Sequence, residues 1–201
     1  MTTFKLTMVA LLALLPLAAG TAFADTDHGY SRIFVFGDSL SDPGNNFAVT
    51  GETSHPPFDP LPVASYGVGG RHYLNGRTWI EYLAQEMGLT KWAKPAYRDP
   101  AFGNYAYAYA RARPFSPVAP SLGEQVQAWS QAGYCTGAAM NETLFVLQIG
   151  ALDVVDGLIA AGQGQDPTAI FSAALGSIAS NIGYLGLPRR SPWGPAPGQP
   201  R

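Results

Sequence analysis

Ser39 is the residue whose type and position best fit covalent chemistry. It lies in the segment Phe-Gly-Asp-Ser-Leu-Ser-Asp-Pro-Gly-Asn-Asn at residues 36–46. Just before it, the apolar run at residues 32–36 predicts a buried strand that ends at Gly37. Ligands of parallel α/β sheets bind beyond the carboxyl ends of the strands, so a serine there could attack an ester carbonyl. Gly-Asp-Ser alone favours a simple turn, since all three residues are common in turns, and only a longer pattern can favour the nucleophile.

A serine hydroxyl is a weak nucleophile unless a general base takes its proton. The chain contains three histidines, His28, His55 and His72. His28 lies near the N-terminus, whereas His55 and His72 lie in a loop-like stretch after Ser39. Catalytic triads occur in several chain orders, so chain order excludes neither loop histidine, although surface loop histidines are far commoner than catalytic bases. Asp38 also has two interpretations: hydrogen bonding to the loop backbone, which we prefer, or a catalytic carboxylate.

Composition argues against several other classes of function. Cys135 is the only cysteine and lies in a loop-like Gly-Tyr-Cys-Thr-Gly stretch, which favours a bystander thiol over a nucleophile. The histidines and the cysteine have no zinc-ligand spacing, so we predict neither a metal site nor a cofactor. The formal net charge of −2 gives no electrostatic reason to bind nucleic acid.

Both ends of the chain differ from the rest. Residues 1–24 predict a signal peptide, with Lys5, an apolar run and an Ala-Phe-Ala cleavage site, although an uncleaved membrane anchor is the alternative. No later stretch looks long and apolar enough to cross a bilayer, so we expect a secreted or periplasmic protein without a stable membrane span. Residues 188–201 are rich in Pro, Gly and Arg and cannot continue a fold. They suggest a linker, a disordered tail or, as we favour, out-of-frame residues after a truncating event.

Between the two ends, strand and helix signals alternate. Residues 45–76 are rich in Gly, Pro, Ser and Tyr and predict a long irregular loop. Thr78 with Glu81, and Ser121 with Glu124, form capping-box patterns that open helices. The expected inner faces of these helices are Trp79, Ile80, Leu83, Ala84 and Met87 in the first, and Leu122, Val126 and Trp129 in the second.

The second half of the chain adds another strand and another helix. Residues 143–149 are nearly all apolar, as in a parallel strand covered on both faces. Asp153 and Asp156 follow that strand and are expected to cap or begin the next helix. Asp166 and Pro167 predict the start of a further helix. The alternation predicts an α/β protein with a mostly parallel sheet, in one domain at residues 31–187.

The segment around Ser39 resembles the first signature block of the GDSL (SGNH) hydrolase family. Other parts are similar to the family's Asn-Gly-x-x-Trp-x-Glu-x-Leu-Ala helix and to its second and third blocks. They are residues 73–84, Asn104-Tyr105-Ala106 with Ala110, and Gly150-Ala151-Leu152-Asp153. The resemblance implies a flavodoxin-like three-layer α/β/α sandwich, here incomplete at its C-terminus, that hydrolyses carboxylic esters, often lipids. It makes Ser39 the nucleophile and its backbone N–H an oxyanion donor. Asp38, Asp42 and Asn45 would support them.

Three departures from the family pattern bear on activity. Ala108-Tyr109 stands where the second block has Gly-Gly, and Leu152 replaces the third-block Asn. No histidine follows His72, whereas the family has an Asp-x-x-His block near its C-terminus. Losing one oxyanion donor typically lowers the rate by ~10²–10³-fold. We therefore expect an esterase or lipase acting on small ester or lipid substrates, with activity well below that of a complete member. The alternative is a non-catalytic secreted protein or a truncated, inactive family member.

Overall fold

The computed structural model describes residues 29–51, 65–66, 70–71, 76–115, 119–134 and 138–186. Several sequence predictions therefore fall outside the described residues. They are the signal peptide at 1–24, the tail at 188–201, the three histidines and Cys135.

The central sheet is parallel, as predicted. Strand β1 (Arg32–Gly37) pairs in parallel with β4 (Thr143–Gln148), with Phe34 opposite Phe145. The segment at residues 103–107 runs along the other edge of β1. Val35 N–H donates to the Gly103 carbonyl at 3.0 Å, and Tyr105 N–H donates to the Val35 carbonyl at 2.8 Å. Strand β1 is thus held on both edges by segments that follow it far along the chain.

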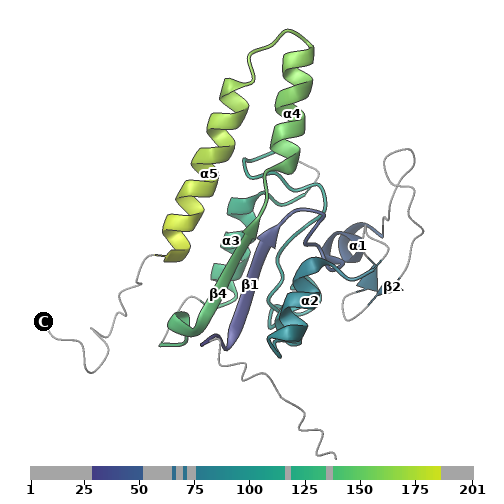
Figure 1. Cartoon of the computed structure of the whole chain (residues 1–201), viewed down its shortest axis with the longest axis vertical. Coiled ribbons are helices and arrows are strands. Elements are labelled where there is room, and N and C mark those ends of the chain that lie inside the picture. The colour runs from purple at the N-terminus through teal and green to yellow at the C-terminus, as the bar shows by residue number, and fades with distance from the viewer. Residues whose placement is uncertain are drawn as a thin grey trace, which may run out of the picture.

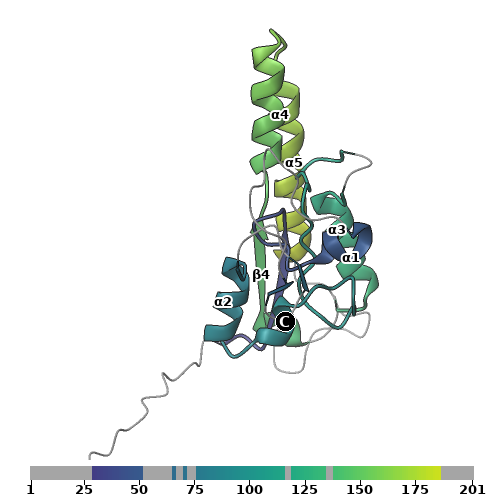
Figure 2. The same ribbon diagram turned by 90° about the vertical axis from the view of Figure 1, so that its right-hand side faces the viewer.

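The sheet is the middle of three layers, because successive side chains of a strand point to opposite faces. Phe34 and Phe36 pack with α3 (Leu122–Gln131) and with Leu185 of α5 (Thr168–Gly186). Ile33 and Val35 pack on the opposite face. Their partners there are α2 (Trp79–Glu86) and the 3₁₀ helix η1 (Thr90–Ala93). Figure 2 shows α2 on one side of β4, with α3 and α5 on the other. The predicted α/β/α layering is confirmed for the described residues.

Helices α2 and α3 begin at the predicted capping boxes. The Glu81 carboxylate accepts the Thr78 N–H at 2.7 Å, and Glu124 accepts the Ser121 N–H at 2.7 Å. The predicted inner face of α2 is wrong at its first position. Trp79 is 43% exposed, because it lies at the helix start and its indole N–H reaches sideways to Ser41.

The irregular loop predicted for residues 45–76 contains regular structure. A short helix, α1 (Asn45–Thr50), lies between Gly44 and Gly51, which both have left-handed backbone conformations. Two-residue strands β2 (Ser65–Tyr66) and β3 (Gly70–Arg71) pair in antiparallel fashion. The prediction was wrong at α1, where the Asp42 side chain, three residues before Asn45, accepts the first N–H groups of the helix.

Helices α4 (Ala151–Gly162) and α5 form a hairpin that extends past the carboxyl ends of the strands (Figure 1). The predicted start of α5 is confirmed, since Asp166 Oδ1 accepts the Thr168 N–H at 2.9 Å. The two helices approach closely at Gly157, where a Cβ atom would lie 2.3 Å from the ring of Phe171. The hairpin is apolar yet exposed. The exposed apolar residues include Val154, Val155, Leu158, Ile159, Leu175 and Ile182.

Two sequence predictions need correction, one about membrane spans and one about the burial of β4. Thr168–Gly186 is long and apolar enough to cross a membrane by length and composition, and little of it is buried inside the fold, so the prediction that no later stretch qualifies was wrong. Strand β4 is also not covered on both faces throughout, because only Thr143 is fully buried. Within the described residues β4 pairs with β1 alone, which leaves its other edge without a neighbouring strand.

Candidate active site

Ser39 lies in the turn just beyond the carboxyl end of β1, as predicted. Two backbone hydrogen bonds hold this turn, one to the end of β4 and one within the turn. Asp38 N–H donates to the Gln148 carbonyl at 3.2 Å, and Ser41 N–H donates back to the Asp38 carbonyl at 3.0 Å. Ser39 itself is half-buried, and no described residue hydrogen-bonds its hydroxyl or its N–H.

Asp42 is the buried centre of the first block. Its Oδ1 accepts the N–H groups of Gly44 at 2.7 Å and Asn45 at 2.6 Å. Its Oδ2 accepts those of Asn46 at 3.1 Å and Ala108 at 2.8 Å. Burial raises the pKa of this carboxyl above its ordinary value, and the four N–H donors oppose that rise. One side chain thus starts α1 and also fixes the second block beside it.

Asn45 joins the same two segments from the other direction. Its amide group donates to the carbonyls of Asn104 and Ala106, both at 2.8 Å, and its Oδ1 accepts the Tyr97 N–H at 2.9 Å. In return, the Asn104 amide donates to the Ser41 carbonyl at 2.9 Å. Together with Asp42, these bonds make the first and second blocks a single hydrogen-bonded unit around Ser39.

Asp38 follows the interpretation preferred from the sequence. Its Oδ1 accepts the Leu40 N–H at 3.1 Å, so the carboxylate supports the turn that carries Ser39. The residue is buried, and this burial raises the pKa of its carboxyl, to which the nearby charge of Asp153 adds. Among the described residues, Oδ2 has no hydrogen-bond partner. Asp38 and Asp153 are thus neighbouring buried acids at the meeting point of two blocks.

Gln125 is a site residue that the sequence reading missed. Its Oε1 accepts the Gly37 N–H at 2.9 Å, and its Nε2 donates to the carbonyls of Gly37 and Pro120, both at 3.0 Å. The side chain thereby satisfies the last residue of β1, next to Asp38. A signal was present in the sequence, because Gln125 is a polar residue on the same helix face as Leu122 and Trp129.

A second missed group connects the active-site turn to α2 and β4. The Ser41 hydroxyl donates to Gln148 Oε1 at 2.8 Å and accepts from the Trp79 indole N–H at 3.0 Å. This chain of bonds explains why Trp79 lies outside the core. It also brings the end of β4 against the turn that carries Ser39.

The third block begins at Gly150, which caps α4 with a φ of 113°. Leu152 lies in the first turn of α4. By the family resemblance, this is the position at which other members have an asparagine that donates through its amide. Asp153 lies in the first turn of α4, as the prediction that these acids cap or begin the helix allows, but neither Asp153 nor Asp156 caps it through its side chain. Asp153 Oδ2 accepts the Ala112 N–H at 2.7 Å, and Asp156 binds the Arg111 guanidinium through two contacts of 3.0 Å.

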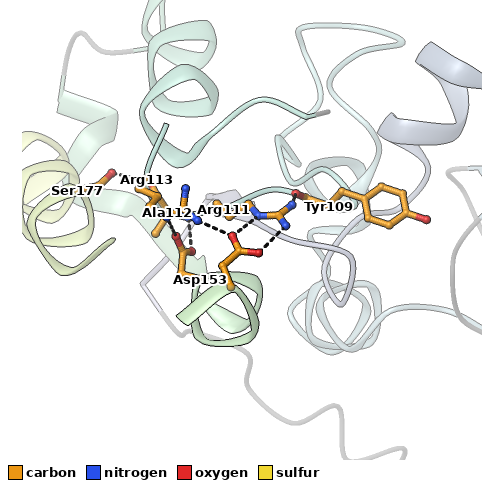
Figure 3. A network of polar contacts seen from close by, with 7 residues as sticks. Tyr109, Arg111, Ala112, Arg113, Asp153 and Ser177 are labelled. Atoms are coloured by element: carbon orange, nitrogen blue, oxygen red, sulfur yellow. Dashed lines mark hydrogen bonds and ion pairs between the residues drawn. The ribbon is translucent and has the colours of Figure 1, made fainter. Parts of the chain in front are cut away.

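This arginine–aspartate cluster ties the second block to α4, as Figure 3 shows. Arg113 adds a contact of 3.3 Å between its Nε and Asp153 Oδ1. The hydrogen bonds from Arg111 hold the pKa of Asp156 below its ordinary value. The partners of the two acids were not predicted, because these partners lie about forty residues earlier in the chain.

The departures in the second block have structural consequences. Tyr109 has a φ of 67°, and no other non-glycine residue in the described part of the chain has a positive φ. Its carbonyl accepts from Arg111 at 2.8 Å, and Figure 3 shows its ring directed away from the cluster. The Ala108 N–H is already used by Asp42, so it cannot also serve an oxyanion. Among the described residues, no group of three or more His, Cys, Asp or Glu side chains could hold a metal ion.

Comparisons with known proteins agree with this assembly of blocks. The model of the family described as GDSL-like lipase/acylhydrolase matches residues 33–194. A GDSL esterase/lipase of Arabidopsis thaliana is 36% identical over 77 residues, a match that covers 37% of this chain and 21% of that protein. The chain thus matches only about a fifth of the length of this curated relative. The family match includes Ser39 and all three blocks, and the chain belongs to the GDSL-like lipase/acylhydrolase family.

Proposed function

We propose that this protein is a secreted carboxylic ester hydrolase that uses Ser39 as its nucleophile. The observation that carries the proposal is the half-buried Ser39 at the end of β1, whose hydroxyl and N–H no described residue engages. Family membership supports hydrolysis as the class of reaction. The substrates we propose are small carboxylic esters or lipids.

In this mechanism Ser39 Oγ attacks the ester carbonyl and forms an acyl-enzyme, and the alcohol leaves with the proton taken from Ser39. Water then releases the acid. The Ser39 N–H would donate to the oxyanion, as expected of a backbone group at this position. The three histidines, which are the side chains best suited to accept this proton, lie outside the described residues. His55 and His72 are the histidines to test for this role.

We further propose that the reaction is slow. Leu152 brings no donor to the oxyanion, and the Ala108 N–H is bonded to Asp42. Losing one such donor lowers a rate by ~10²–10³-fold in other hydrolases. Because the groups of an active site act together, the separate losses should not be multiplied.

The first experiment compares hydrolysis of p-nitrophenyl butanoate by the parent chain and by Ser39→Ala at neutral pH. The rate should fall to background in Ser39→Ala and stay unchanged in Ser172→Ala, which alters an exposed serine of α5. Leu152→Asn should raise the Ser39-dependent rate about tenfold or more by restoring a donor. A parent rate that survives Ser39→Ala would contradict the proposal.

The competing function is a non-catalytic secreted protein, and Leu152 is the observation that favours it. In that case neither the parent nor Leu152→Asn would show any Ser39-dependent hydrolysis. Secretion has its own test. Mass spectrometry of protein exported by a bacterial host should give an N-terminus at Asp25, and an intact Met1 on the exported protein would contradict a cleaved leader.

A further inference from the structure

A cavity of about 660 Å³ lies beside the end of β1, between α1, α3 and the segments at residues 96–115 and 119–120. Its volume is within the range of ~300–1,000 Å³ typical of sites for small organic ligands. Its walls include apolar and aromatic side chains from all of these elements. Among them are Val49, Tyr97, Tyr107, Phe115, Pro120 and Ala128.

The polar groups around this α1–α3 cavity are mostly engaged already. Glu124 is the one charged residue among the described residues that line it, and its Oε2 accepts from the N–H and hydroxyl of Ser121. The Gln125 amide is used by Gly37 and Pro120. Burial raises the pKa of Tyr107 to about 12, so its hydroxyl stays neutral at physiological pH. The lining thus offers contact area and neutral hydroxyls but no cation.

Two residues of the cavity lining also bind the backbone just before the nucleophile. Gln125 and Tyr107 both line the cavity, and both hydrogen-bond the backbone of Gly37, two residues before Ser39. We propose that the α1–α3 cavity binds an uncharged hydrocarbon chain, such as the acyl chain of an ester, while its carbonyl reaches Ser39. This inference rests on the proposed function for its link to catalysis. Glu124 and the nearby Asp42 would disfavour a free fatty acid anion there.

The direct test measures binding of 1-octanol to the whole chain by isothermal titration calorimetry. Octanol is uncharged and carries no ester, so its binding requires no catalysis. Ala128→Trp places a large ring on the exposed part of the cavity wall and should weaken octanol binding about tenfold or more. The matched control is Gln127→Trp, at the next residue of α3, which is also exposed but does not line the cavity and should bind as the parent does.

Circular dichroism of each variant checks that the fold is kept, and Tyr107→Phe gives a second variant that keeps the ring. Octanol should bind Tyr107→Phe with nearly the parent affinity, since alkyl contact needs no hydroxyl. Absence of octanol binding in the parent, or equal affinity in Ala128→Trp, would overturn the proposal.

Kinetics separate this inference from the proposed function. Ala128→Trp should lower kcat/KM for p-nitrophenyl octanoate relative to the acetate ester. Ser39-dependent hydrolysis with an unchanged octanoate-to-acetate ratio would refute the cavity's role and leave the esterase function intact. Octanol binding that Ala128→Trp removes, in a chain without Ser39-dependent hydrolysis, would support the cavity and refute the esterase.

Discussion

The turn region around Ser39 and the α4–α5 hairpin are organised in opposite ways. In the turn region, buried side chains such as Asp42, Asn45 and Gln125 bind backbone groups, so the chain has little freedom. The hairpin presents apolar side chains to the outside, and it is joined to the rest of the fold through Gly150, through α3, and through bonds of Asp153, Asp156 and Ser177 to residues 111–113. The turn region is thus held by buried polar groups with satisfied partners, whereas the hairpin leaves much of its apolar surface uncovered.

The largest effect is expected from Asp42→Ala. It leaves four buried N–H groups without an acceptor, each of which costs about 1–3 kcal/mol when unsatisfied. We expect a loss of about 3 kcal/mol or more in the free energy of unfolding, measured by urea denaturation with tryptophan fluorescence. Asp99→Ala, which removes a similar turn bond at an exposed carboxylate, should change it by less than about 1 kcal/mol. Equal losses in the two variants would show that the buried Asp42 carboxylate contributes no more to stability than the exposed Asp99 carboxylate.

The same carboxylate predicts a pH dependence. Burial raises the pKa of Asp42 in the folded chain, so the folded state binds its proton more tightly than the unfolded state does. The stability contributed by this group is therefore fully present below its unfolded pKa of about 3.8 and is lost as pH rises through the folded pKa. Asp42→Asn removes this titration. From pH 4 upward, the free energy of unfolding of the parent should fall relative to that of Asp42→Asn, and a rise would show that the hydrogen bonds outweigh burial.

A smaller effect concerns the backbone at Tyr109. A side chain with a Cβ atom at a φ of 67° costs about 1–2 kcal/mol relative to glycine. Tyr109→Gly should therefore be more stable than Tyr109→Ala by about 1 kcal/mol, after the greater flexibility of glycine in the unfolded chain is allowed for. The comparison uses thermal and urea unfolding of both variants. An alanine variant as stable as the glycine variant would show that no strain is stored there.

The smallest effect tests the hairpin. Gly176 lies within α5 with open space around it, so Gly176→Ala should stabilise the chain by about 0.5 kcal/mol through helix propensity. Gly157→Ala should gain nothing, because its Cβ would meet the Phe171 ring. Urea unfolding compares the two variants. An equal gain in both would show that the two helices do not pack closely at Gly157.

Local patterns predicted the framework well. The apolar runs gave β1 and β4, and the capping boxes at Thr78 and Ser121 gave two helix starts. Ser39 was placed correctly because it directly follows a strand. These features depend on residues within a few positions of one another.

The parts that sequence missed depend on distant partners. Gln125 binds the backbone of Gly37, 88 residues away, and Ser41 binds Gln148 across 107 residues. Helix α1 is different, because its Asp42 partner lies only three residues before Asn45. Asp153 binds the Ala112 N–H, 41 residues away. No periodicity or local propensity encodes such pairings, since they form only when the tertiary fold brings the segments together.

Both segments that pair with β1 are synthesised long after β1 itself. One edge of β1 is completed only when residues 103–107 have been made, and the other only when residues 143–148 have been made. At about 5–20 residues per second, the wait between Ser41 and its partner Gln148 is on the order of 5 to 20 seconds. Throughout that interval β1 can gain at most one of its two neighbours, the segment at residues 103–107. The apolar strand before Ser39 is therefore incompletely covered while the rest of the chain is made.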